Sequence, residues 1–152
     1  MWFIWVIGGI IIYVLLMRFA GTKLEDNEVN KYGGLRLMYS DYFADLKAAF
    51  PNLTINPSEG STIRYQFMMP ESAIQYELNS KYIKNYMFTT YKMYVSNAGE
   101  LKLIYQSEKL SFENSSFNQF EMSHSIITRL MLDNNKWNDI SNNQYPNRDR
   151  LL

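Results

Sequence analysis

The sequence predicts an α+β protein: a transmembrane helix at the N-terminus, then a small domain with an antiparallel meander sheet of four to six strands flanked by two helices. Residues 2–17 carry no charged side chain, apolar and polar residues alternate along much of 53–112, and helical apolar spacing occurs on both sides of that region. Alternation indicates strands with one solvated face, whereas parallel strands covered on both faces are apolar throughout. The order helix, meander, helix is typical of α+β domains.

The composition limits the classes of function. Hydrophobic residues make up 47% of the chain and charged residues 20%, which is typical of a folded protein. The 15 Lys and Arg residues balance 15 Asp and Glu residues, so the net charge gives no argument for nucleic-acid binding. The chain has no cysteine and therefore no disulfide or thiolate metal site. We expect an anchor over residues 1–20, a polar tether over 21–34, the α+β domain over 35–133 and a polar tail over 134–152.

The anchor MWFIWVIGGIIIYVLLMRFA is long enough to cross a bilayer, because twenty helical residues extend about 30 Å. Trp2 and Trp5 are expected at one interface and Arg18 at the other. A cleaved signal peptide is the alternative, but it needs a basic N-terminal region and small residues before the cut. A cut after Ala20 would place Arg18 at one of those positions, so we favour an uncleaved helix.

Two further features of the anchor concern its neighbours and its orientation. Gly8 and Gly9 form a notch where another helix can approach, although they do not make a GxxxG motif. Lys and Arg residues favour the cytoplasmic side of a bacterial inner membrane, and here they all follow the apolar run. We therefore predict the N-terminus outside and the domain in the cytoplasm, with a periplasmic domain as the alternative. The basic residues concerned are Arg18, Lys23, Lys31 and Arg36.

Residues 21–34 (GTKLEDNEVNKYGG) are polar and end in two glycines, which indicates a tether. The next segment, 35–50, predicts a helix because its apolar residues recur at intervals of three and four. Pro51 cannot continue a helix and ends this one. The apolar stripe expected to cover the sheet consists of Leu35, Tyr39, Tyr42, Leu46 and Ala49.

Strand periodicity starts at Leu53. Residues 53–55 and 62–69 alternate on either side of the turn-rich sequence NPSEGS, and Pro70 ends the second strand. Residues 72–86 fit both a strand, by alternation, and a helix, by apolar residues spaced four apart; we favour the strand.

The segment 87–105 predicts a β-hairpin. Residues 97–100 form its turn, with Gly99 where a positive φ is needed, and Leu101, Leu103 and Tyr105 resume the alternation. Leu110 and Phe112 are expected to form a short edge strand.

The last helix is expected over residues 116–133. Ser116 and Gln119 have the spacing of a capping box. The tail after this helix is expected to be irregular, with Trp137 and Ile140 docking part of it. The apolar stripe of the helix is Phe117, Phe120, Ile127 and Met131, with Leu130 beside it.

Candidate catalytic residues are scarce. His124 is the only histidine, and its place on the apolar stripe of the last helix favours a partly buried structural role. The glutamates are scattered over polar positions, and no nucleotide-binding or nucleophile motif occurs. We expect no catalytic residues, no metal site and no cofactor, and we expect that the protein is not an enzyme.

Aromatic residues form 16% of the chain, with tyrosine the most frequent. Tyr82, Tyr86, Tyr91 and Tyr94 lie among lysines in KYIKNYMFTTYKMY. Packing on a half-exposed sheet explains such tyrosines without any ligand. Because tyrosine is also enriched at protein–protein hot spots, these four are our candidate protein-binding residues.

The sequence therefore favours a single-pass, membrane-bound protein-interaction domain whose partners are the lipid bilayer and another protein, and not nucleic acid. An accessory subunit of a membrane complex and an immunity-type inhibitor both fit. Two alternatives stay open. One is a membrane-associated hydrolase acting on lipid or glycan through His124 and a carboxylate. The other is a small-ligand sensor, which would need an apolar cavity between the sheet and the helices.

Overall fold

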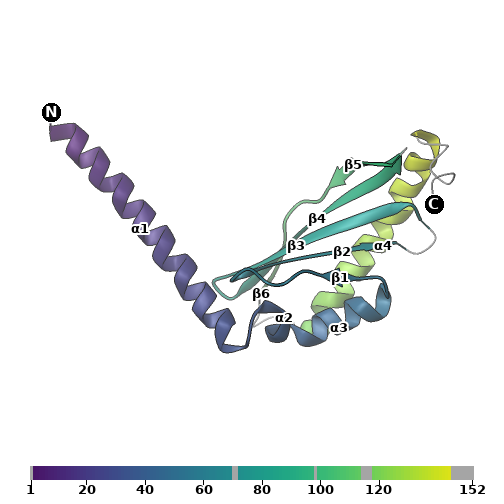
Figure 1. The fold of residues 1–152 in the computed structure, drawn as a ribbon, viewed down its shortest axis with the longest axis horizontal. Coiled ribbons are helices and arrows are strands. Elements are labelled where there is room, and N and C mark those ends of the chain that lie inside the picture. Colours follow the sequence, from purple (N-terminus) through teal and green to yellow (C-terminus); the bar gives the residue numbers. More distant parts are fainter. Residues whose placement is uncertain (1, 70–71, 98, 114–117, 145–152) are drawn as a thin grey trace.

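The computed structural model describes residues 2–69, 72–97, 99–113 and 118–144. It confirms the predicted α+β class: a long apolar N-terminal helix precedes an antiparallel sheet and a C-terminal helix. In Figure 1, α1 (Trp2–Lys31) extends away from the rest of the chain, and α4 (Gln119–Gln144) lies along the sheet. Two shorter helices, α2 (Leu35–Met38) and α3 (Ser40–Ala49), lie between α1 and the first strand.

The sheet is a meander in the order β1-β2-β3-β4-β5, and β6 pairs with β4. β6 pairs with residues 86–89 of β4 and β5 with residues 92–97, so β5 and β6 share one edge. The stretch that fitted both a strand and a helix is β3, which confirms the strand. The strands are β1 (Thr54–Ile55), β2 (Thr62–Met68), β3 (Ile74–Ile83), β4 (Tyr86–Asn97), β5 (Glu100–Gln106) and β6 (Leu110–Glu113).

Two tight turns set the register of the long strands. Lys84 (φ 46°) and Asn85 (φ 68°) form a two-residue connection between the paired residues Ile83 and Tyr86. Two consecutive positive φ angles are typical of the turns that match the twist of a hairpin. Gly99 has a φ of 82°, as the sequence predicts for the β4–β5 hairpin.

The core lies between one face of the sheet and the helices α3 and α4. Alternate residues of β2, β3 and β4 are buried, so the period-two pattern has the expected structural meaning. The core also contains a chain of hydroxyl hydrogen bonds: Tyr42 Oη to Tyr65 Oη (2.8 Å), Tyr65 Oη to Ser80 Oγ (2.8 Å) and Ser80 Oγ to Thr89 Oγ1 (2.7 Å). Burial raises the pKa of Tyr42 and Tyr65, so both phenols are neutral donors within this chain.

The expected tether is wrong for residues 21–31, because α1 continues through them to Lys31. The C-terminal part of α1 packs on the domain: Val29 is fully buried, and the Ser61 backbone N–H donates to Asp26 Oδ1 at 2.7 Å. Asp26 and Val29 are three positions apart and therefore lie on the same side of the helix. The polar sequence of this segment thus belongs to a helix docked at one side, not to an irregular connection.

The helix expected over residues 35–50 is divided at Tyr39, whose φ of −116° and ψ of 42° are not helical. Gln119 from α4 explains the division. Its Oε1 accepts hydrogen bonds from the backbone N–H groups of Asp41 (3.0 Å) and Tyr42 (3.1 Å), and its Nε2 donates to the Met38 carbonyl (3.0 Å). The backbone carbonyl at the end of α2 and the backbone N–H groups at the start of α3 therefore form hydrogen bonds with the side chain of a residue distant in sequence. The predicted stripe is confirmed: Leu35, Tyr39, Tyr42 and Leu46 are buried and Ala49 is half-buried.

The last helix starts later and ends later than the sequence predicts. Ser116 lies outside the described residues, and the observed cap is a reciprocal pair: Asn118 Oδ1 accepts from the Glu121 N–H (2.8 Å), and Glu121 Oε2 accepts from the Asn118 N–H (3.2 Å). The expected irregular tail is wrong for residues 134–144, which are helical. Trp137 packs against the core, with its ring 5.2 Å from that of Tyr105.

The apolar stripe predicted for this helix is also wrong, except that Leu130 is buried and Ile127 half-buried. Phe120 is 66% exposed and Met131 47% exposed, whereas the helix packs on the core through Met122, Ile126 and Leu130. The sequence of α4 contains two apolar stripes, one through Phe120, Ile127 and Met131 and one through Met122, Ile126 and Leu130. Helical periodicity alone does not determine which of them packs on the sheet. Phe117 and the side chain of Ile140 lie outside the described residues.

Candidate protein-interaction surface

The face of the sheet opposite α3 and α4 is the candidate functional surface; we call it the open face. The strand register gives its cross-strand rows, because opposed residues of antiparallel strands lie on the same side. Nearest the β4–β5 hairpin, Ser96 opposes Leu101. The next row consists of Met68, Gln75, Tyr94 and Leu103, and the row after it of Thr54, Gln66, Glu77, Lys92 and Gln106.

The end of the open face near the β4–β5 hairpin is apolar. Leu101 is 54% exposed and Leu103 47% exposed, and both oppose open-face residues of β4. The Tyr94 hydroxyl donates to Glu77 Oε2 at 3.2 Å. Burial, followed by the neighbouring Glu77 carboxylate, raises the pKa of Tyr94, so the phenol is a neutral donor. Exposed leucines beside an anchored tyrosine and a carboxylate resemble the apolar core and polar rim of protein interfaces.

The other end of the open face carries a second aromatic group. Tyr86 is 36% exposed, and its ring stacks on that of Phe88 at 5.8 Å between centroids. Lys109 places Nζ 3.8 Å from the centroid of Phe88, which is a cation–π geometry.

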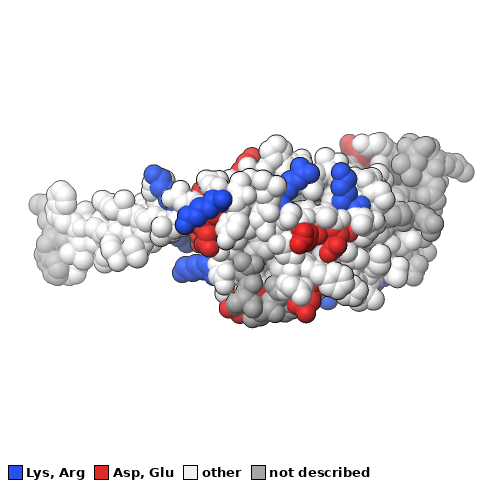
Figure 2. Space-filling model, turned by 90° about the horizontal axis from the view of Figure 1, so that it is seen from below, with Lys and Arg blue, Asp and Glu red and all other residues white. Residues whose placement is uncertain are grey.

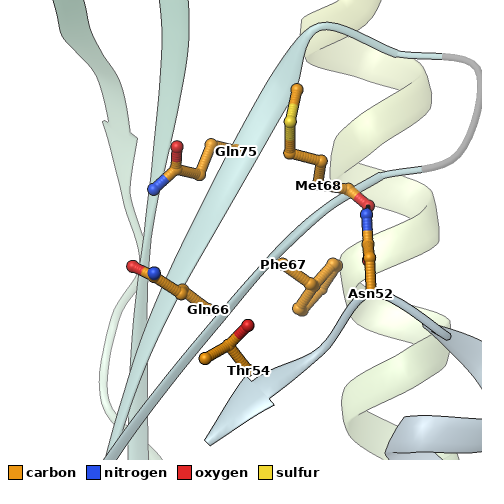
Figure 3. Close-up of a pocket in the computed structure, with 6 residues that line it drawn as sticks. All are labelled: Asn52, Thr54, Gln66, Phe67, Met68 and Gln75. Atoms are coloured by element: carbon orange, nitrogen blue, oxygen red, sulfur yellow. Dashed lines mark hydrogen bonds between the residues drawn. The ribbon is translucent and has the colours of Figure 1, made fainter. Parts of the chain in front are cut away.

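A shallow hollow of about 270 Å³ lies beside β1, and Figure 3 shows the six residues that line it: Asn52, Thr54, Gln66, Phe67, Met68 and Gln75. Asn52 Nδ2 donates to the Met68 carbonyl at 3.0 Å. Gln66 and Gln75 present amides that can both donate and accept hydrogen bonds. Phe67 instead stacks on Phe50 in the core, with ring centroids 4.0 Å apart. The hollow is therefore polar and lies on the outer side of the sheet, whereas a sensor cavity was expected between sheet and helices.

The four candidate tyrosines divide between the two faces of the sheet. Tyr86 and Tyr94 lie on the open face. Tyr82 and Tyr91, which the sequence also makes candidate protein-binding residues, are buried on the core face, 0% and 1% exposed, and offer no surface to a partner. Odd and even positions of β4 point to opposite faces of the sheet. Tyr91 lies at an odd position and is buried, like Met93, whereas Tyr86 and Tyr94 lie at even positions.

Each buried tyrosine has a polar environment under the helices. The Tyr82 hydroxyl has no hydrogen-bond partner among the described residues, and burial, followed by the Glu28 carboxylate, raises the pKa of Tyr82 to about 12. The Tyr91 hydroxyl donates to the Asp133 carboxylate, which also pairs with Arg129 Nε at 3.4 Å. Both tyrosines therefore serve the packing of the domain.

The sequence did not single out Leu101 and Leu103 as surface residues. A bulge explains this: Tyr105 pairs with Met93 and Leu103 with Tyr94, so Ile104 has no opposed partner on β4. An extra residue reverses the side on which the following residues lie. Leu103 is thus on the open face, while the Tyr105 ring faces Tyr91 at 6.1 Å on the core side.

His124 is exposed rather than partly buried, so that prediction is wrong. Its ring lies against Phe120, with centroids 6.1 Å apart, because both follow the outward stripe of α4. Among the residues the structure describes, none forms a hydrogen bond or an ion pair with His124, and no three His, Asp or Glu residues form a metal-binding group. The hydrolase hypothesis therefore has no observed carboxylate partner for this imidazole.

The apolar part of α1 is exposed along its length. Trp5 is 83% exposed, and nothing lies within 4 Å of where a Cβ would stand on Gly8 or Gly9. Its most apolar stretch of 18 residues has a mean hydropathy of 2.2, and the helix is long and apolar enough to cross a membrane. Trp2 begins the helix and Arg18 follows the apolar run. On the side that Figure 2 shows, no charged group is visible on the white outer part of α1, and charges of both signs appear where α1 meets the domain.

Compared with protein-family models, with curated proteins and with solved structures, the chain matches none.

Proposed function

We propose that this protein is a single-pass, membrane-anchored protein-interaction domain without enzymatic activity, acting as an accessory subunit of a membrane complex or as an immunity-type inhibitor. The observation that carries the proposal is the pairing of a long exposed apolar helix with a domain whose sheet is covered on one face only. Such a helix has no stable place in water, and a bilayer covers it. The open face then remains for a partner.

The proposed orientation follows from the charges at the end of the apolar run. Arg18 and Lys23 are exposed on α1, and Lys84 from the β3–β4 turn lines the same groove as Arg18. Basic residues at this end favour a cytoplasmic domain, with the N-terminus on the outer side of the inner membrane. A protease added to spheroplasts tests this orientation: survival of the domain supports it, and digestion in intact spheroplasts would place the domain in the periplasm.

The proposed binding surface is the apolar end of the open face. Tyr94 is held by Glu77, while Leu101 and Leu103 are exposed beside it. A held aromatic side chain surrounded by exposed leucines offers a partner a large apolar contact at a small cost in conformational entropy. Gln66 and Gln75 in the adjoining hollow supply hydrogen-bonding groups that can pair with a partner's backbone.

Co-purification from native membranes tests the proposal. The surface variant combines Tyr94→Ala with Leu103→Ser, and the matched control combines Phe120→Ala with Leu132→Ser, which are exposed apolar residues of α4. We expect the wild type and the control to recover the same partner and the surface variant to lose it, with all three showing the same thermal unfolding midpoint. Equal recovery by the surface variant would eliminate the open face, and recovery of no partner by the wild type would contradict the interaction itself.

A further inference from the structure

A groove of about 460 Å³ lies between α1 and the turn that joins β3 to β4. Its volume is within the range of ordinary small-molecule sites. The groove contains an apolar and a polar part. Tyr13, Val14 and Met17 line the apolar part, and all three belong to the C-terminal part of the exposed apolar run of α1.

Arg18 and Lys84 make the polar part of the groove basic. Neither side chain forms an ion pair or a hydrogen bond with any residue that the structure describes. The Thr22 hydroxyl, which also lines the groove, is used within the helix, where it donates to the Arg18 carbonyl at 2.7 Å. Glu25 is the one carboxylate among the described lining residues, so the two cations exceed the local negative charge.

The conformation of the β3–β4 turn fixes the position of Lys84 beside α1. Lys84 and Asn85 have φ angles of 46° and 68°, which fix the turn conformation, and ten consecutive residue pairs join β3 to β4 behind it. A non-glycine residue with a positive φ is uncommon, so lysine at this position has a conformational cost. Two cationic groups from distant parts of the sequence are thus held at one level of α1, where its apolar run ends.

We propose that this groove binds an anionic phospholipid, with the phosphate between Arg18 and Lys84 and an acyl chain along Tyr13, Val14 and Met17. The assignment rests on the proposed membrane anchoring of α1. Charge complementarity favours an anionic headgroup over a zwitterionic one, because the lining residues carry two cations, Arg18 and Lys84, against the single carboxylate of Glu25. The apolar lining favours a lipid over free phosphate, because a headgroup alone leaves that part of the groove unfilled.

Native mass spectrometry of the full chain, ejected from nanodiscs of phosphatidylcholine and phosphatidylglycerol in equal amounts, tests the lipid site. The central variant is Lys84→Asn, because asparagine tolerates a positive φ and removes the cationic group from the groove. Lys84→Arg keeps the charge, and Lys92→Asn removes a lysine of the open face instead. Each basic residue near an anionic headgroup contributes about a fivefold factor in affinity. We therefore expect wild type, Lys84→Arg and Lys92→Asn to retain phosphatidylglycerol selectively, and Lys84→Asn to lose about fivefold of that selectivity.

Four results would overturn the proposal in distinguishable ways. Equal retention of the two lipids by an inserted wild-type protein eliminates the lipid site and leaves the anchoring intact. An unchanged preference in Lys84→Asn, or an equal loss in Lys92→Asn, eliminates the groove as the site. Displacement of the retained lipid by millimolar glycerol phosphate assigns the groove to a free phosphate compound. Failure of the wild type to resist carbonate extraction from vesicles contradicts the anchoring, and with it the lipid site.

Discussion

The contact between α1 and the domain makes a quantitative prediction at Gly60. Gly60 has a φ of 56°, and a Cβ built on it would stand 2.4 Å from Asp26 Oδ1 and 2.8 Å from Asp26 Cγ. Asp26 Oδ1 accepts the hydrogen bond from the Ser61 N–H, and Ser61 is 3% exposed. Gly60→Ala therefore requires both a left-handed alanine and a displaced carboxylate.

The two costs have different magnitudes. A left-handed conformation costs a non-glycine residue about 1 kcal/mol. Loss of a hydrogen bond to a charged acceptor, which leaves the buried Ser61 N–H without a partner, costs about 2 kcal/mol. Gly60→Ala should therefore lower the free energy of unfolding by about 3 kcal/mol. When Asp26 is already alanine, the displaced carboxylate is absent and the same substitution should cost only about 1 kcal/mol, which is a coupling of about 2 kcal/mol.

Urea unfolding of the full chain in a mild detergent, followed by the near-ultraviolet circular dichroism of the tyrosines, measures these values. Gly99→Ala is the matched control, because Gly99 has a φ of 82° with nothing within 4 Å of its Cβ position. It should cost about 1 kcal/mol in either background. The reasoning is refuted if Gly60→Ala costs no more than Gly99→Ala, or if its cost is unchanged in the Asp26→Ala background, since the end of α1 would then not be docked.

Three further predictions concern the domain. Ile126→Ala should destabilise it by about 2–4 kcal/mol and Phe120→Ala by less than about 0.5 kcal/mol, in urea unfolding; the reverse order would mean that α4 presents its other stripe to the sheet. Burial raises the pKa of Tyr42 and Tyr65 above the unfolded value of about 10. These two phenols should therefore leave the free energy of unfolding unchanged below pH 10 and lower it above pH 10, by up to about 1.4 kcal/mol per pH unit for each phenol. A urea midpoint that stays constant above pH 10 would contradict this. Asn118→Ala should lower the free energy of unfolding by about 1 kcal/mol, and Asn118→Ser should lower it less, since serine also caps a helix. Equal thermal unfolding midpoints for the two variants would mean that the pair of Asn118 and Glu121 does not cap α4.

The strand order and the buried faces of the strands were predictable because they depend on local alternation. Ile74, Tyr76 and Leu78 alternate with polar residues in the sequence. All three are buried in the structure, because one face of the sheet packs on helices. The elements that the sequence misplaced depend on contacts between distant residues. The break at Tyr39 depends on Gln119, eighty positions away, and no periodicity within the helix itself signals it.

The candidate surface was only partly predictable, for a related reason. Tyr86 and Tyr94 follow from strand parity, but Leu103 reaches the open face only because Ile104 is bulged. A bulge is set by the pairing of two strands and leaves little trace in one of them. Similarly, Lys84 gains a role beside Arg18 only when the β3–β4 hairpin lies on α1, which the polar sequence of residues 21–31 does not reveal.

The continuous helix through Lys31 has a mechanical consequence for a membrane-bound chain. With about 20 of its 30 residues in the hydrocarbon core, the remaining turns of α1 extend about 15 Å beyond it. Since Asp26 and Val29 fix those turns to the domain, the height and tilt of the open face above the bilayer are set by the helix itself. The proposed partner, if it lies in the same membrane, would search for this face in two dimensions and lose mainly rotation about one axis on binding. Association needs less favourable contact energy under those conditions than it does between two freely tumbling proteins.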